Sequence, residues 1–387
     1  MSFSHLSRRL VALTAAATAV AATVLPAGAA GRTPVPPRIG HLFVVDLENK
    51  GYDETFGATA PPYLAKVLPS QGALLTQYYA TGHASLDNYI TQVSGQAPNM
   101  YTQADCQRYV DLLPGTPLPD GSGQVTGQGC VYPASVQTLP DQLMTAGRTW
   151  RGYMEDLGAD PTREKKTCGN PGSSAAPGTQ DPTQVATAKD QYAARHNPFP
   201  YFHSLVDSGA CDEHVGSLDR LPGDLRGTAT TPTFSWITPD LCSDGHDTNC
   251  VDGRPGGLTS INDFLRIWVP RITSSPAFRK DGLLVITFDE SEANDAGSCC
   301  GAPSGPNTPA PGISGPGGGR VGAVLLSPYI EPGTRSDVAY DHYSALRSYE
   351  DLLGLRTGGT DGKGHLGYAA RAGLRTFGAD VFTARRR

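Results

Sequence analysis

The sequence contains no internal repeat, no basic stripe and no long apolar run beyond its N-terminus. Its 387 residues carry a formal charge of −6. An acidic chain without a basic stripe is a poor nucleic-acid binder. The stretch from Leu10 to Leu25 is rich in Ala and Val, and it is shorter than the roughly 20 strongly apolar residues that span a bilayer. We therefore expect no nucleic-acid partner and no stable membrane insertion.

The N-terminal apolar stretch has the features of an export signal. Arg8 and Arg9 precede it, and Ala27-Gly28-Ala29 follows it. A basic segment, an apolar segment and a small-residue cleavage site together define a secretory signal peptide. The paired arginines also fit twin-arginine export. We predict a signal peptide over residues 1–30, cleaved near Ala29-Ala30, and a secreted product.

Cysteine is sparse but occurs in an even number, eight, which suits disulfides in an oxidising compartment. The rival interpretation, a zinc site, lacks a C-x-x-C pair with matching histidine spacing. We predict the local pairs Cys106–Cys130 and Cys242–Cys250. The neighbours Cys299 and Cys300 are expected to bond to different partners, with Cys168 and Cys211 as candidates, although eight cysteines allow 105 connectivities.

Short apolar runs that end in polar side chains define the predicted fold. Residues 39–47, 233–238, 283–288 and 320–327 have this pattern, which is typical of buried strands in a parallel sheet. Helical patterns lie between them. We predict an α/β fold with a central, mostly parallel β-sheet flanked by helices. It forms a single domain over residues 39–380 with long disulfide-tied loops, after a Pro-rich spacer over residues 31–38.

Two of these predicted strands end in oxygen-bearing side chains. The first delivers Glu48 and Asn49, and the run up to residue 288 delivers Asp289 and Glu290. Ligands collect beyond the carboxyl ends of strands in open α/β sheets. Three carboxylates that converge there would repel one another unless a hard divalent cation lay between them. The pattern therefore predicts a metal site.

Ser85 stands where a loop meets an apolar, helix-capable run from Leu86 to Val93. One interpretation is that its side chain caps this helix, the commonest role of serine at such a position. The other is a nucleophile at a helix N-terminus, where backbone N–H groups favour a bound anion. The two interpretations are compatible, and both stay open here.

Several histidines have charged neighbours at comparable positions. His246 is flanked by Asp244 and Asp247 after a predicted strand, which suits proton transfer or a phosphate-facing role. His342 follows Asp341 at a helix start, and Arg195 precedes His196 beside an apolar turn, where the basic pair either binds an anion or caps a helix. For His41, His203, His214 and His365 structural roles are the better hypothesis.

Together these clusters resemble the bacterial phosphoesterase family of secreted acid phosphatases and phospholipases C, which have the alkaline-phosphatase-like fold. The resemblance extends from about residue 39 to residue 355. The motifs that carry it are Val44-Val45-Asp46-Leu47-Glu48-Asn49, His83-Ala84-Ser85-Leu86-Asp87-Asn88-Tyr89, Asp244-Gly245-His246-Asp247, Thr287-Phe288-Asp289-Glu290 and Tyr340-Asp341-His342-Tyr343.

The resemblance implies a role for each matching residue. It implies one divalent metal ion (Ca, Mg, Mn, Zn or Fe) whose ligands are Glu48, Asn49, Ser85, Asp289 and Glu290. It makes Ser85 the nucleophile that forms a phosphoserine. The groups that hold the phosphoryl oxygens or protonate the leaving alkoxide are His83, His196, His246, His342 and Asp247. Members of the acid-phosphatase branch carry prolines where this chain has Ala84 and Asp87, which puts the stiffness of the Ser85 loop in question.

The function that this resemblance implies is hydrolysis of phosphate monoesters, with phosphoinositides or other phosphorylated metabolites as candidate substrates. Compact size and the lack of an appended domain favour this branch. The first alternative is a phospholipase C-type phosphodiesterase that acts on phospholipid headgroups. The second is a secreted binding protein that keeps the fold without turnover.

Overall fold

The computed structural model describes residues 1–2, 36–57, 59–171 and 180–384. All but the first two residues of the predicted signal peptide, and most of the Pro-rich spacer, lie outside the described residues. Within the described chain, no helix combines the length and the apolar character that a membrane crossing would require. The fold below is that of the unit that begins at Pro34.

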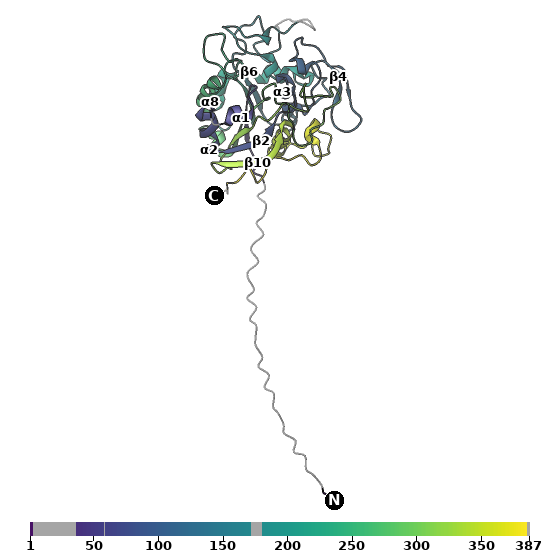
Figure 1. Ribbon diagram of the computed structural model, residues 1–387. Coiled ribbons are helices and arrows are strands. Elements are labelled where there is room, and N and C mark those ends of the chain that lie inside the picture. Colours follow the sequence, from purple (N-terminus) through teal and green to yellow (C-terminus); the bar gives the residue numbers. More distant parts are fainter. Residues whose placement is uncertain (3–35, 58, 172–179, 385–387) are drawn as a thin grey trace. The chain divides into compact units, whose positions relative to one another are not determined.

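The apolar run after Ile39 forms a strand in the interior of a large sheet. Figure 1 labels β2, β6 and β10 of this sheet. Eight strands of the described chain make this sheet, in the order β10-β2-β9-β8-β1-β7-β5-β6. Their bounds are β1 (His41–Leu47), β2 (Ala73–Tyr79), β5 (Trp150–Met154), β6 (Val215–Ser217), β7 (Phe234–Thr238), β8 (Gly282–Phe288), β9 (Ala323–Leu326) and β10 (Thr334–Asp341).

Five of the seven junctions between neighbouring strands of this sheet are parallel. β1 runs parallel to β7 and β8, β5 runs parallel to β6 and β7, and β10 runs parallel to β2. Among the eight described strands of this sheet, only β9 runs opposite to the others, antiparallel to its neighbours β2 and β8. The predicted mostly parallel sheet is therefore confirmed. A separate hairpin pairs β3 (Leu113–Pro117) with β4 (Val125–Gln128).

Helices cover both faces of the sheet. On β1, Phe43 packs against Phe278 of α9, whereas Asp46 accepts a hydrogen bond from Gln92 of α3. Because strand side chains alternate between the two faces, α9 and α3 lie on opposite sides. The helices are α1 (Tyr52–Phe56), α2 (Leu68–Gln71), α3 (Ser85–Ser94), α4 (Leu139–Thr145), α5 (His203–Val206), α6 (Ala210–His214), α7 (Leu221–Asp224), α8 (Leu258–Thr273), α9 (Pro276–Asp281) and α10 (His342–Leu353).

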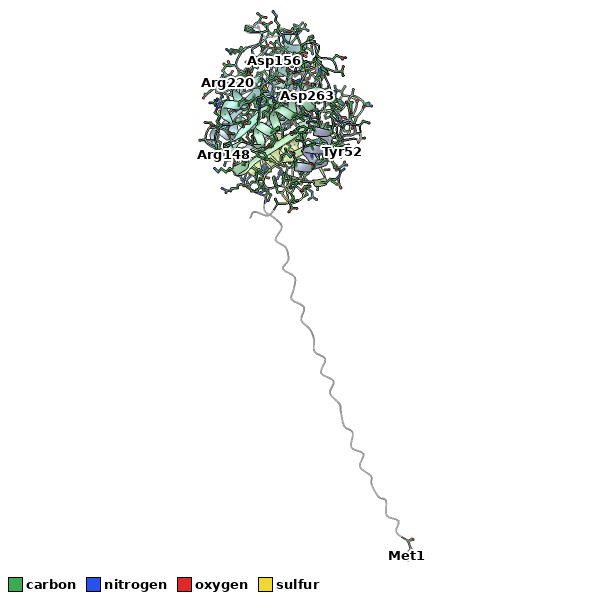
Figure 2. All side chains as sticks on the ribbon, turned by 90° about the vertical axis from the view of Figure 1, so that its left-hand side faces the viewer. Met1, Tyr52, Arg148, Asp156, Arg220 and Asp263 are labelled. Carbon is green, nitrogen blue, oxygen red and sulfur yellow. A yellow bond between two sulfur atoms is a disulfide. The ribbon has the colours of Figure 1, made fainter. Side chains whose placement is uncertain are left out.

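The carboxyl ends of the parallel strands face one edge of the sheet. In Figure 2 Arg148, just before β5, lies low in the view, and Asp156, just after β5, lies high. The parallel strands that neighbour β5 share this direction. The residues that follow them, including Glu48 and Asp289, therefore emerge at the same edge.

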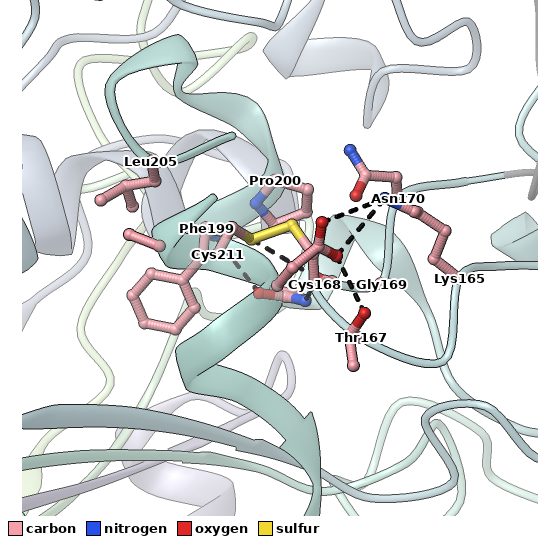
Figure 3. Close-up of a disulfide and its surroundings, with 12 residues drawn as sticks. Lys165, Thr167, Cys168, Gly169, Asn170, Phe199, Pro200, Leu205 and Cys211 are labelled. Carbon is pink, nitrogen blue, oxygen red and sulfur yellow. Dashed lines mark hydrogen bonds and ion pairs between the residues drawn. A yellow bond between two sulfur atoms is a disulfide. The ribbon is translucent and has the colours of Figure 1, made fainter. Parts of the chain in front are cut away.

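Four disulfides join the eight cysteines. Cys106–Cys130 and Cys242–Cys250 are confirmed. The expectation that Cys299 and Cys300 bond to different partners is wrong, because these neighbours bond to each other. The reason is that the fold brings Cys168 to Cys211 of α6, with their Cα atoms 4.9 Å apart (Figure 3). The two cysteines are 43 residues apart in the sequence, so their pairing could not be predicted from local spacing.

Candidate active site

The site begins where β1 and β8 end side by side. The two strands pair in parallel with Leu47 opposite Phe288, so Glu48 and Asp289 leave the sheet at the same level. The backbone N–H of Asn49 donates to Asp289 Oδ1 at 3.1 Å. Glu48 and Asp289 are both fully buried. The strand pattern had predicted this meeting of the two strand ends.

Ser85 is the first residue of α3, and its hydroxyl faces the end of β1. Its Oγ donates to Glu48 Oε2 at 2.8 Å, and the side chain is 3% exposed. Ala84 is the N-cap residue, and no side chain caps the helix from that position. The backbone N–H of Leu86 instead donates to Asp105 Oδ1 at 3.0 Å. Ser85 is therefore not the helix cap, and its hydroxyl is committed to a buried carboxylate.

A three-residue cluster lies beside Ser85. Glu48, His196 and Asp244 each offer a ligand atom, and these atoms lie within 4.8 Å of one another. His196 Nδ1 lies 3.0 Å from Asp244 Oδ2, and its ring stacks on Tyr89 with the ring planes 6° apart. His196 Nε2 lies 3.2 Å from Glu48 Oε1, yet neither atom has a partner in hydrogen-bonding geometry.

The unpartnered atoms show how these residues fit a cation. Glu48 Oε1, Asp289 Oδ2 and His196 Nε2 are buried without a hydrogen-bond partner. Buried polar atoms are normally satisfied, and leaving one unpaired costs about 1–3 kcal/mol. Carboxylate oxygens and a neutral imidazole nitrogen are ligands of divalent metals. The donor set present at this edge therefore fits a divalent cation.

The pKa shifts of the clustered residues also favour a bound cation. Burial, reinforced by Asp289 and Asp244, raises the pKa of Glu48 well above its ordinary value. Burial also raises the pKa of Asp289 to about 7, against the backbone hydrogen bonds that it accepts from Glu290 and Asn49. Burial lowers the pKa of His196 well below its ordinary value. Ionised carboxylates are thus disfavoured here unless positive charge lies among them.

Glu290 follows Asp289 but turns toward a different partner. Its Oε2 lies 2.7 Å from His83 Nδ1, and His83 Nε2 lies 3.1 Å from the backbone carbonyl of Glu292. Both side chains of the pair are 8% exposed. Glu290 and His83, both predicted site residues, therefore form an imidazole–carboxylate pair next to the Glu48 cluster.

His342 is buried behind the site. Its Nε2 donates to the backbone carbonyl of Asp289 at 2.7 Å, and Nδ1 accepts from the hydroxyl of Tyr78 at 3.1 Å. Burial lowers the pKa of His342 to about 4. Both ring nitrogens are engaged, so neither is left for a phosphoryl oxygen. In this arrangement His342 fixes the backbone that carries Asp289.

His246 lies on the other side of the cluster, with a third of its side chain exposed. Its Nδ1 lies 2.9 Å from Asp247 Oδ1, and its Nε2 lies 3.2 Å from Arg195 Nη2. A guanidinium can only donate, so Nε2 is the acceptor and the ring proton lies on Nδ1, toward Asp247. Burial and the charge of Arg195 lower the pKa of His246.

The structure places near the candidate site several residues to which the sequence analysis assigned no role. Asp244 was noted only as a neighbour of His246, and Asp105, 19 residues after Leu86, gave no signal because it lies in a loop. Asp87 was noted only for replacing a proline. It is 1% exposed, and both carboxylate oxygens lack a hydrogen-bond partner. Arg195 was noted only as one half of a basic pair.

Comparison with known proteins found relatives that are named acid phosphatases. The chain is 25% identical to a probable acid phosphatase of Kluyveromyces lactis over 312 residues, which cover 80% of this chain and 57% of that protein. It is 26% identical to an acid phosphatase of Aspergillus fumigatus over 319 residues, 81% of this chain and 55% of that protein. The chain thus spans little more than half the length of these curated relatives.

Three further comparisons concern another curated relative, a solved structure and a family model. A phosphatidylinositol-3-phosphatase of Mycobacterium tuberculosis is 23% identical over 322 residues, 82% of this chain and 78% of that protein. The solved structure of a protein in the alkaline phosphatase superfamily from Vibrio parahaemolyticus superposes with a TM-score of 0.44 at 13% identity, covering 84% of this chain and 69% of that one. The model of the phosphoesterase family matches residues 60–356. The chain belongs to the phosphoesterase family.

Proposed function

We propose that this protein is a secreted, metal-dependent phosphoesterase that hydrolyses phosphate monoesters through a phosphoserine at Ser85. One observation carries the proposal. The Ser85 hydroxyl, at the N-terminus of α3, donates at 2.8 Å to a buried carboxylate whose other oxygen has no partner. Membership of the phosphoesterase family and the acid-phosphatase relatives support it.

The reaction follows from this geometry. Ser85 Oγ attacks the phosphorus, its proton passes to Glu48 Oε2, and the bond from phosphorus to the leaving oxygen breaks. A positioned acid protonates the leaving alkoxide. The candidate is the imidazole–carboxylate pair His83–Glu290, because the one ring proton of His246 faces Asp247. Water then hydrolyses the phosphoserine, which releases phosphate and restores the hydroxyl.

A divalent cation would be held by Glu48, Asn49, Ser85, Asp289 and Glu290, to which the geometry adds His196 and Asp244. When bound, such an ion lowers the pKa of the serine hydroxyl and screens the charge of the phosphate. Oxygen ligands suit Ca, Mg or Mn, and a histidine ligand also admits Zn or Fe. His342 would hold the backbone of Asp289 in place for this role.

The substrate class proposed is a phosphate monoester, with phosphoinositides among the candidates because of the name of the mycobacterial relative. Secretion is proposed from the N-terminal signal pattern and is supported by the four disulfides.

The test is hydrolysis by the secreted protein of para-nitrophenyl phosphate and of phosphatidylcholine, each with and without chelator. Chelator-sensitive release of nitrophenol is the expected result. Activity on phosphatidylcholine alone would transfer the protein to the phospholipase C branch. No hydrolysis of either substrate by a folded, metal-loaded protein would favour the binding-protein alternative.

A further inference from the structure

Arg195 is a buried cation that links two parts of the site. It lies on a short 3-10 helix, η4 (Ala194–His196), and is 4% exposed. Its Nη2 donates to His246 Nε2 at 3.2 Å, and its Nη1 donates to the backbone carbonyl of Gln184 at 3.2 Å. Its Nε lies 3.9 Å from Asp105 Oδ2, beyond hydrogen-bond distance. A guanidinium has five N–H donors, so these two hydrogen bonds leave donors to spare.

Two neighbours of Arg195, Asp105 and His246, lead back to Ser85 by separate routes. Through Asp105 the route reaches the backbone N–H of Leu86, which immediately follows the serine. Through His246 it reaches His196, whose ring centre lies 5.8 Å away, and then the carboxylate that accepts from Ser85. The closed ring of contacts runs through Ser85, Glu48, His196, His246, Arg195, Asp105 and Leu86.

Within this ring Arg195 supplies the permanent positive charge. A guanidinium stays protonated in proteins, and Arg195 is the one arginine or lysine among the seven residues of this ring. A phosphate monoester dianion therefore meets one permanently cationic side chain there.

A helix N-terminus could bind the phosphate in place of Arg195, but the N-terminus of α3 is already partly occupied. The Asp105 carboxylate takes the Leu86 N–H of α3. The negative charge of Asp105 stands where an incoming anion would otherwise approach that amide. We therefore expect a side chain to bind the phosphoryl group. Arginine suits this role because its guanidinium can donate two parallel hydrogen bonds to a phosphate.

We propose that Arg195 binds the phosphoryl oxygens of the substrate and that His246, held by Asp247, positions the guanidinium. This inference rests on the proposed function. It differs from the assignment of His246 as a direct phosphate ligand, because His246 Nε2 already accepts from Arg195. It also makes Asp105 a positioning residue that keeps Arg195 close to the start of α3.

The experiment compares Arg195→Ala, Arg195→Lys and wild type with inorganic phosphate and para-nitrophenyl phosphate as probes. For Arg195→Ala we expect the inhibition constant of phosphate and the KM to rise at least about tenfold, since a charge-assisted pair is lost. Arg195→Lys should recover part of this loss. Millimolar guanidinium ion should partly rescue Arg195→Ala, a result that a purely structural role would not give.

Arg254→Ala is the matched control. Arg254 also lies near this edge of the sheet, but it pairs with Asp240 and Asp252 and is half exposed. Its removal tests the loss of a positive charge without touching the ring, and we expect constants within about threefold of wild type. Metal content and melting temperature are measured on each variant, and Arg195→Gln replaces Arg195→Ala if the latter does not fold.

The inference is overturned if a folded Arg195→Ala or Arg195→Gln variant keeps the phosphate inhibition constant within twofold of wild type. It is also overturned if Arg254→Ala weakens phosphate binding as much as Arg195→Ala does. These outcomes are separate from failure of the proposed function. If the proposed function failed, the wild-type protein would hydrolyse no phosphate ester. Phosphate binding to wild type and the Arg195 variants could still be compared by calorimetry.

Discussion

Two acidic clusters lie at the same edge of the sheet, and they differ in how their oxygens are satisfied. After β5 and β7, Glu155 Oε2 accepts from the backbone N–H of Asp240, and Asp240 Oδ1 accepts from two backbone N–H groups. Arg254 adds a positive charge 3.6 Å from Asp240 Oδ2. The cluster around Glu48 instead contains buried atoms without partners. Both clusters therefore place carboxylates at strand ends. The candidate active site differs from the other cluster because some of its buried carboxylate oxygens have no hydrogen-bond partner.

The largest effect is expected from substitutions in the cluster around Glu48. The double variant Asp289→Asn, Glu290→Gln should abolish phosphatase activity and metal content together, because it removes two proposed anionic ligands. Activity is measured on para-nitrophenyl phosphate and metal by mass spectrometry of the purified protein. Metal retained at wild-type stoichiometry would contradict the ligand assignment.

A second large effect is expected at Ser85. Ser85→Ala should lower turnover by at least about 10³-fold, because removing a nucleophile from a site of this kind has that order of effect. The fold should survive, since the hydroxyl makes one hydrogen bond, to Glu48. Circular dichroism and thermal unfolding check the fold. Activity near the wild-type value would place the nucleophile elsewhere, with Thr81 or a water molecule as the candidates.

The matched variants in the other cluster sharpen the comparison. Glu155→Gln and Asp240→Asn should leave activity on para-nitrophenyl phosphate within about threefold of wild type, because these carboxylates are already satisfied by protein donors. Their metal content should equal that of wild type. A loss of activity comparable to that of the Asp289 and Glu290 variant would show that the two clusters form one functional unit.

A smaller effect concerns pH and stability. Burial, followed by the charge of Asp240, raises the pKa of Glu155 to about 8. The folded protein therefore holds this proton where the unfolded chain has lost it, between the ordinary pKa of 4.5 and about 8. The contribution of this group to the free energy of unfolding is fully present below that window and falls as pH rises through it.

Denaturant unfolding of wild type and Glu155→Gln across this pH window checks the prediction. Glutamine stays neutral, so the variant should lose less stability than wild type as the pH rises. Identical pH dependence in the two proteins would show that Glu155 ionises at its ordinary pKa in the folded state.

Much of the fold and part of the site follow from local sequence patterns. The apolar runs identified the strands on both sides of the site, and their polar exits identified Glu48 and Asp289, because a strand end constrains its next residues to one edge of the sheet. Ser85 was placed at the start of a helix, as observed, although its hydroxyl bonds to Glu48 and not to the helix.

The parts that escaped prediction depend on contacts between distant segments. Asp105 reaches α3 from a loop, and Cys168 meets Cys211 across 43 residues. A carboxylate next to a histidine also does not by itself indicate a site residue. His41 pairs with Asp281, and His365 pairs with Asp361, both away from the site. Neighbours in space, which one sequence does not reveal, decide these roles.

The most direct test of the account is the identity of the residue that carries phosphate during turnover. The metal-loaded protein is mixed with para-nitrophenyl phosphate, quenched in acid, and mapped by peptide mass spectrometry. We predict a phosphoryl group on Ser85, absent from the Ser85→Ala variant. Phosphate found on another residue, or turnover without any phosphoprotein in the wild type, would contradict the assignment of Ser85 as the nucleophile.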